Sequence, residues 1–172
     1  MKTLYIVRHA KSDRDNFSVE DFERPLNERG LKDAALIAEY IAKKGISPDI
    51  VIASPAIRAM KTAQIFTHTL NYPPEKIIPE MNLYYSTIQE MEKVITDISD
   101  EYNSAMIFGH NPTLTDFVNK HSDAMLDYMP TTGFAVINIE GNNWSNTVKN
   151  KNKLIFFVCP KMLNERKNGV LI

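Results

Sequence analysis

The stretch Leu4-Tyr5-Ile6-Val7-Arg8-His9-Ala10-Lys11-Ser12 begins with four apolar residues and ends in charged and polar ones. The same layout recurs where residues 105–108 run into Gly109-His110-Asn111-Pro112, and where residues 49–53 run into Ser54-Pro55-Ala56-Ile57-Arg58. Short apolar runs of this kind predict buried strands, and α/β sheets bind ligands beyond the carboxyl ends of their strands. We therefore expect two histidines and two arginines, His9, His110, Arg8 and Arg58, to meet around one anion.

Length and composition limit the classes of protein to consider. The chain has 172 residues, of which 44% are hydrophobic and 24% charged, and its formal net charge is −1. These values indicate one globular domain over residues 1–172, with no general attraction to nucleic acid or to an anionic membrane. The apolar run before Arg8 is too short for a signal peptide or a membrane span, so the default location is cytoplasmic.

Helix signals alternate with the strand signals. Asn27 is a good N-cap for a helix of about 28–44 with Gly45 as its stop, and Ser54 with Pro55 predicts the start of a second helix. A capping box at 87–90 opens a helix that we expect to end near Tyr102. Asn111 with Pro112 predicts a last helix, to about residue 120.

The remaining apolar runs complete the expected sheet. Residues 76–78 are a short strand candidate, and 134–139 and 153–158 are expected strands joined by a polar stretch. The alternation predicts an α/β three-layer sandwich, in which helices cover both faces of a mostly parallel sheet. The closing pair of strands suggests an antiparallel edge.

Several of these blocks resemble the signatures of a known family. Residues 4–12, Ser54-Pro55-x-x-Arg58-Ala59-x-x-Thr62-Ala63 and Gly109-His110-Asn111-Pro112 resemble the histidine phosphatase superfamily, whose fold is phosphoglycerate mutase-like. Arg24-Pro25-Leu26-Asn27-x-Arg29-Gly30, Leu83-Tyr84 and Met129-Pro130-Thr131 resemble its SixA-type phosphohistidine phosphatases more narrowly.

The resemblance implies roles for individual residues. The histidine matching His9 is the nucleophile, Arg8 and Arg58 hold the phosphoryl oxygens, and His110 donates a hydrogen bond to them. Ser12 and Lys11 are further candidates for the lining of the pocket, although a polar loop explains both equally well. We interpret the charged stretch 10–26 most simply as a solvated loop, and alternatively as a contact for a phosphoprotein.

One block departs from the broader superfamily. Many members that hydrolyse esters carry an acid in a Leu-x-Glu block, which reads Leu83-Tyr84-Tyr85 here. Glu80 or Tyr85 is left as an alternative proton donor. An alkoxide leaves poorly without such an acid, whereas the imidazole of a phosphohistidine leaves readily.

We therefore expect a metal-independent phosphatase that cleaves phosphohistidine in proteins through phospho-His9, without a cofactor. One alternative is a general phosphomonoesterase acting on small phosphorylated substrates, and another is a non-catalytic module that binds phosphate. The sequence leaves the physiological substrate and the oligomeric state open.

Overall fold

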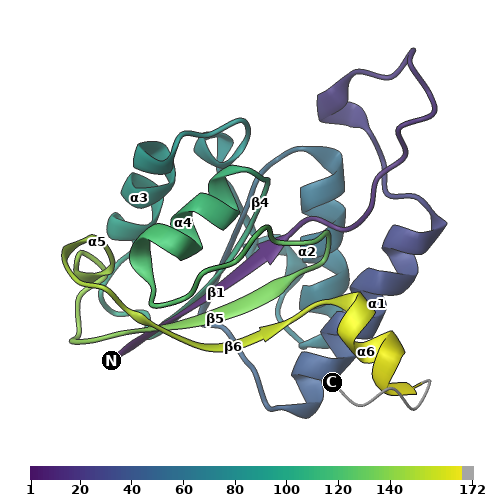
Figure 1. Ribbon diagram of the computed structural model, residues 1–172. Helices are drawn as coiled ribbons and strands as arrows, with labels where there is room; N and C mark the ends of the chain where they lie inside the picture. Colours follow the sequence, from purple (N-terminus) through teal and green to yellow (C-terminus); the bar gives the residue numbers. More distant parts are fainter. Residues whose placement is uncertain (168–172) are drawn as a thin grey trace.

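The computed structural model describes residues 1–167, so the last five residues of the expected domain, 168–172, lie outside the described part. A six-stranded sheet in the order β3-β2-β4-β1-β5-β6 forms its centre (Figure 1). Its strands are β1 (Lys2–Arg8), β2 (Ile50–Ala53), β3 (Ile78–Pro79), β4 (Ser104–Gly109), β5 (Phe134–Ile139) and β6 (Lys153–Val158). The first four are parallel, and β5 and β6 add the antiparallel edge, which confirms the predicted sheet.

Helices cover both faces of this sheet (Figure 1). One layer contains α1 (Glu28–Lys43), α2 (Ile57–Thr69) and α6 (Pro160–Lys167); the other contains α3 (Ile88–Thr96), α4 (Thr113–His121) and α5 (Asn146–Lys149). Three single turns of 3-10 helix are η1 (Asp21–Glu23), η2 (Pro74–Lys76) and η3 (Met81–Leu83).

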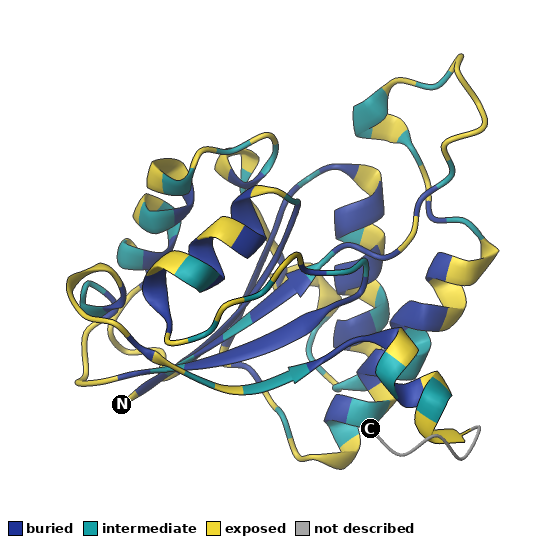
Figure 2. Ribbon diagram, viewed as in Figure 1, coloured by how far each residue is buried: buried dark blue, intermediate teal, exposed yellow. Residues whose placement is uncertain are grey.

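The strands β2, β4 and β5 are almost wholly buried between the layers, whereas the edge strands β3 and β6 are largely exposed or half-buried (Figure 2). Successive residues of β1 point to opposite faces, so Ile6 packs in the cluster that contains Phe117 of α4, and Val7 in the cluster that contains Phe66 of α2. Each helical layer therefore has its own apolar core against the sheet, as a three-layer sandwich requires.

Two of the predicted helix starts are confirmed by their caps. The side chain of Asn27 accepts a hydrogen bond from the amide of Gly30, and Gly45, with a φ of +73°, follows the end of α1. Thr87 and Glu90 form both bonds of the capping box that opens α3.

The other two predicted helix starts are wrong by two residues and by one residue. α2 begins at Ile57 rather than at Pro55, because Ala56 is still extended, with a ψ of 136°. α4 begins at Thr113, and the side chain of Asn111 bonds Met129 and Thr115. Both predicted cap residues thus have a partner distant in sequence, which is Met129 for Asn111 and His110 for Ser54.

Two further elements differ from expectation in their boundaries, and a helix was not expected. α3 ends at Thr96, well before Tyr102, because Asp100 accepts hydrogen bonds from Asn143 and Trp144 and draws the chain away from the helix axis. The strand expected at 76–78 is β3 at 78–79, since a 3-10 turn occupies 74–76. Sequence reasoning also missed α6.

The register of the sheet places the residues after β1 beside those after β4. Arg8 pairs with Gly109, and the amide of His9 donates to the carbonyl of Gly109 at 3.1 Å. On the other side, the amide of Thr132 donates to the carbonyls of Arg8 and His9, each at 3.1 Å. His9 is therefore fixed from both neighbouring segments.

The first turn of α1 packs closely against the backbone of the residues after β1. A Cβ at position 30 would overlap the carbonyl of Lys11, which also accepts a hydrogen bond from Asn27 at 3.0 Å. In an open helix position Gly→Ala stabilises by about 1 kcal/mol. We expect Gly30→Ala to destabilise instead, by about 2 kcal/mol, since the Lys11 backbone must move. Urea unfolding measures the difference.

Gly45→Ala is the matched control, because its Cβ meets no atom within 4 Å and only its positive φ is unfavourable. We expect it to cost about 1 kcal/mol. A Gly30→Ala protein more stable than the wild type would contradict the close packing.

Candidate active site

His9 lies directly after β1. The hydrogen bond of its imidazole ring decides which of the two ring nitrogens is free to react. The residue is 6% exposed, and Nδ1 lies 2.7 Å from the carbonyl oxygen of Ala10. A carbonyl can only accept, so Nδ1 carries the hydrogen and Nε2 keeps its lone pair. Burial, together with the nearby His110 and two arginines, lowers the pKa of His9 to about 3. The imidazole is therefore neutral at physiological pH.

His110 lies beside it, at the end of β4. The two imidazole centroids are 5.0 Å apart, and Nε2 of His110 lies 2.8 Å from the hydroxyl of Ser54. Burial and the charge of Arg58 lower its pKa to about 3 as well. Its Nδ1 is buried and has no hydrogen-bond partner within residues 1–167.

The guanidinium groups of Arg8 and Arg58 complete the cluster of four side chains that the sequence analysis predicts. Arg58, 4% exposed, donates to the backbone carbonyl of Asp21 at 2.6 Å and to its carboxylate at 3.0 Å. Arg8 donates to the carbonyl of Met129 at 2.9 Å. The Nε atoms of both arginines are buried and unpartnered among the described residues. Such N–H groups can donate to an anion.

Thr62 ties the helix that carries Arg58 to the end of β1. Its hydroxyl accepts from the amide of Ala10 at 2.9 Å and donates to the carbonyl of Arg58 at 2.7 Å. The first turns of α2 therefore keep a fixed position relative to His9.

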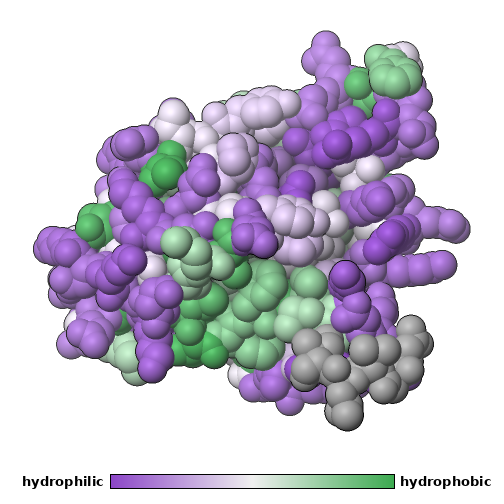
Figure 3. All heavy atoms as spheres, in the orientation of Figure 1, coloured by the Kyte–Doolittle hydropathy of each residue, from purple (hydrophilic) through white to green (hydrophobic). Residues whose placement is uncertain are grey.

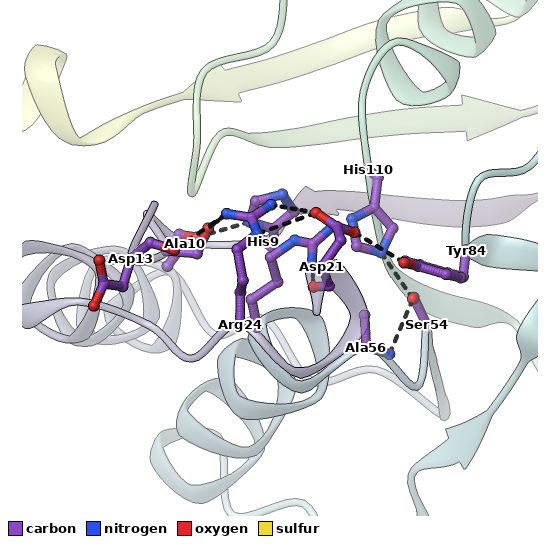
Figure 4. Close-up of polar contacts among 11 residues, drawn as sticks. His9, Ala10, Asp13, Asp21, Arg24, Ser54, Ala56, Tyr84 and His110 are labelled. Atoms are coloured by element: carbon purple, nitrogen blue, oxygen red, sulfur yellow. Dashed lines mark hydrogen bonds and ion pairs between the residues drawn. The ribbon is translucent and has the colours of Figure 1, made fainter. Parts of the chain in front are cut away.

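The interpretation of residues 10–26 as a solvated loop is wrong for Asp21 and Arg24. Figure 4 shows Asp21 between Arg24 and Tyr84. Its carboxylate accepts from Arg24 at 2.7 and 3.0 Å and from the Tyr84 hydroxyl at 2.9 Å, besides its ion pair with Arg58. Burial alone would raise the pKa of Asp21, but the hydrogen bonds it accepts outweigh burial and hold it well below its ordinary value of 3.8.

One local feature of the sequence indicates this network, namely the spacing of Asp21 and Arg24 by three residues. Nothing local indicated that Arg58 and Tyr84 would join them across 37 and 63 residues. The burial of Tyr84 and its bond to Asp21 raise the pKa of the phenol, so it stays a donor.

The remaining candidates occupy different places. The Ser12 hydroxyl accepts a hydrogen bond from Arg24 at 2.5 Å, while Lys11 is exposed. Tyr85 lines the same cleft as His9. Glu80 lies in a separate hollow, where its carboxylate accepts from the amide of Asn82 and caps η3.

Two adjoining clefts open onto His9. The site cleft, of about 570 Å³, contains Arg58 and His110 in its lining, and the side cleft, of about 870 Å³, extends towards α1 and α6. Arg8, His9 and Arg14 line both. Seven cationic side chains line the two clefts, against four anionic ones, although the whole chain has a net charge of −1. They are Arg8, Lys11, Arg14, Arg24, Arg29, Arg58 and Lys161 against Asp13, Asp15, Asp21 and Asp33.

The clefts thus concentrate positive charge where the two histidines lie, which attracts anions. Within residues 1–167, no three His, Cys, Asp or Glu side chains are grouped in a way that could hold a metal ion. In the same range, no helix has the length and apolar character to cross a membrane.

Comparison with known proteins identifies the family. Residues 4–93 match the model of the histidine phosphatase superfamily (branch 1). The chain belongs to this superfamily. A relative from Mycobacterium leprae, an uncharacterized protein, is 27% identical over 167 residues, which cover 90% of this chain and all of that protein.

Solved structures of histidine phosphatases have the same fold. The protein histidine phosphatase SixA complexed with tungstate superposes with a TM-score of 0.80 at 20% identity, covering 94% of this chain and 99% of that one. A candidate phosphohistidine phosphatase SixA from Agrobacterium tumefaciens gives a TM-score of 0.78 at 27% identity, covering 92% and 98%.

The depressed pKa of Asp21 predicts how its contribution to stability depends on pH. Because the carboxylate is favoured in the folded state, its stabilisation is present above about pH 5 and is lost as the pH falls through the folded-state pKa. We expect Asp21→Asn to be less stable than the wild type at pH 7, with a gap that narrows steadily below about pH 4. Urea unfolding at several pH values measures this gap.

Asp15→Asn, an exposed carboxylate of the same loop, controls for the loss of a charge and should give a much smaller gap at every pH. If the gap for Asp21→Asn did not change with pH, the carboxylate would not be the group that stabilises the loop.

Proposed function

We propose that this histidine phosphatase removes the phosphoryl group from phosphohistidine in proteins, with His9 as nucleophile and without a metal ion. The observation that carries the proposal is the hydrogen bond from Nδ1 of His9 to the Ala10 carbonyl at 2.7 Å. It leaves the lone pair of Nε2 available, and the lowered pKa means that no base has to remove a proton first.

In the proposed reaction, the lone pair of Nε2 attacks phosphorus, and an N–P bond to His9 forms. The P–N bond to the substrate imidazole breaks, and its electron pair returns to that ring. A water molecule then attacks the phosphoryl group, the bond to His9 breaks, and inorganic phosphate leaves with the ring nitrogen restored. The double displacement replaces one difficult step with two easier ones.

Three unpartnered N–H groups suit the charge of the phosphoryl oxygens. Nε of Arg8 and of Arg58 are two, and Nδ1 of His110 is the third if the Ser54 hydroxyl donates to Nε2 of that ring. The amide of Ala56 donates to the oxygen of Ser54 at 3.4 Å, which supports this direction. Loss of one such donor commonly lowers a rate by roughly 10²- to 10³-fold.

The leaving group favours phosphohistidine over an ester. Asp21 is held ionised by its partners and is a poor acid, and Glu80 lies outside the site cleft. An imidazole already protonated on its other nitrogen departs as a neutral ring and needs no acid, whereas an alkoxide needs one.

Hydrolysis of small phosphate esters is the second candidate, and one observation favours it. The phenol of Tyr85 lines the site cleft together with His9 and His110, where it is the nearest equivalent of the acid in the block Leu83-Tyr84-Tyr85. For an ester substrate this candidate predicts that Tyr85→Phe lowers kcat, because the ring remains and only the proton is lost.

The two candidates are separated by measuring rates on a histidine-phosphorylated protein and on an alkyl phosphate ester, with a chelator present. We expect a kcat/KM at least roughly 10³-fold higher on the phosphohistidine, and a loss of at least roughly 10³-fold in His9→Ala, since removal of a covalent nucleophile has effects of this size or larger.

His68→Ala is the matched control, because His68 lies in the last turn of α2 and lines neither cleft. It should retain the wild-type rate. Equal or faster ester hydrolysis would remove the proposed specificity, and a His9→Ala protein with normal turnover would remove the mechanism.

A further inference from the structure

We propose that Phe17, Tyr85 and Tyr128 form an aromatic rim that binds the surface of the protein carrying the phosphohistidine. The inference rests on the proposed function and adds the residues that would select a protein over a small phosphorylated molecule. These side chains are 97%, 72% and 62% exposed, respectively. Tyr85 also interacts with Asp21, whose pKa its hydroxyl helps to lower.

The three rings come from separate segments but surround the same histidine. Phe17 and Tyr85 line the site cleft with His9, and Tyr128 lines the side cleft, which also contains His9. Tyr128 further lines a third hollow together with Arg8 and Asn111. A molecule whose phosphoryl group reaches His9 therefore has exposed rings near it on more than one side.

Phenylalanine is among the residues most often fully buried, and tyrosine is over-represented among the residues that contribute most to binding at the centres of protein interfaces. Phe17 lies in the loop 10–26, which projects beyond the sheet in Figure 1. Figure 3 shows this loop as largely hydrophilic, with hydrophobic residues at its outer end. The apolar surface is thus displayed at the loop's tip.

The backbone at Tyr85 supports a functional reason for the position of its ring. Tyr85 has a φ of 48°, in the left-handed region that bulky residues rarely adopt. Strain of this kind is concentrated at binding and catalytic sites. The ring packs against Tyr84 at a centroid distance of 4.5 Å, and most of its surface is exposed.

The depth of the site points to a protein as the occupant. Arg58 and His110 are buried at the base of the site cleft, whereas Phe17 is almost fully exposed. A free phosphorylated amino acid held by the buried groups would leave much of the rim uncovered. A phosphohistidine on a protein surface places its ring in the cleft and its neighbouring side chains against the rim.

The test compares one reaction on two carriers. The substrates are a small helical domain with a single exposed phosphohistidine, phosphorylated by phosphoramidate, and the free amino acid phosphohistidine. We expect the double variant Phe17→Ala, Tyr128→Ala to lower kcat/KM on the domain by at least roughly 30-fold, mainly through KM, since each aromatic contact at an interface commonly contributes roughly 10-fold or more. The rate on the free amino acid should stay within twofold.

Ile155→Ala is the control for the loss of exposed apolar surface, because Ile155 is exposed on β6 and lines neither cleft. It should leave both rates unchanged. The unchanged rate on the free amino acid also shows that the double variant is folded.

Two results would contradict the proposed binding role of the aromatic rim. One is an equal loss on both substrates, which would mean that the rings support the site itself; the other is an unchanged kcat/KM on the domain. Failure of the proposed function would give a different result, because the wild-type protein would then hydrolyse neither substrate. The proposed role of the rim would be rejected together with the function.

Discussion

The parallel pairing of β1 with β4 buries two imidazoles beside two guanidinium groups, and the chemistry of the site depends on this constraint. Because they are buried and positive charge lies close by, His9 and His110 are neutral at pH values where an exposed histidine starts to protonate. Desolvation by itself would leave their orientation free. The Ala10 carbonyl, just after β1, and the Ser54 hydroxyl, directly after the neighbouring strand β2, fix it.

A cluster of arginines beside neutral histidines needs a counterion in the folded chain, and Asp21 supplies it. Its carboxylate contacts Arg24 and Arg58, which joins the loop after β1 to the start of α2. Only the Nη atoms of Arg58 bond Asp21, while its Nε stays unpartnered among the described residues. The ion pair therefore orients the guanidinium group and leaves one donor for a substrate.

Most of the fold and the four central side chains could be predicted from the sequence, because strands end abruptly in polar residues and the helix caps are local signals. Asn27 and Thr87 cap as predicted, since their partners lie three residues away. Ser54 and Asn111 lie one or two residues before the observed N-caps; each accepts a long hydrogen bond from a nearby amide, but partners distant in sequence also bond their side chains. The same limitation hid the role of Asp21: a charged loop has no periodicity, and its contacts to Arg58 and Tyr84 exist only after folding.

The central claim is that Nε2 of His9 becomes phosphorylated during turnover. Rapid mixing with a phosphohistidine protein, quenching in alkali, and peptide mass spectrometry with phosphorus NMR measure it directly. We expect a phosphoryl group on His9, attached to Nε2, since Nδ1 is bonded to Ala10. Turnover without phosphorylated His9, or with the group on Nδ1 or another side chain, would contradict the mechanism.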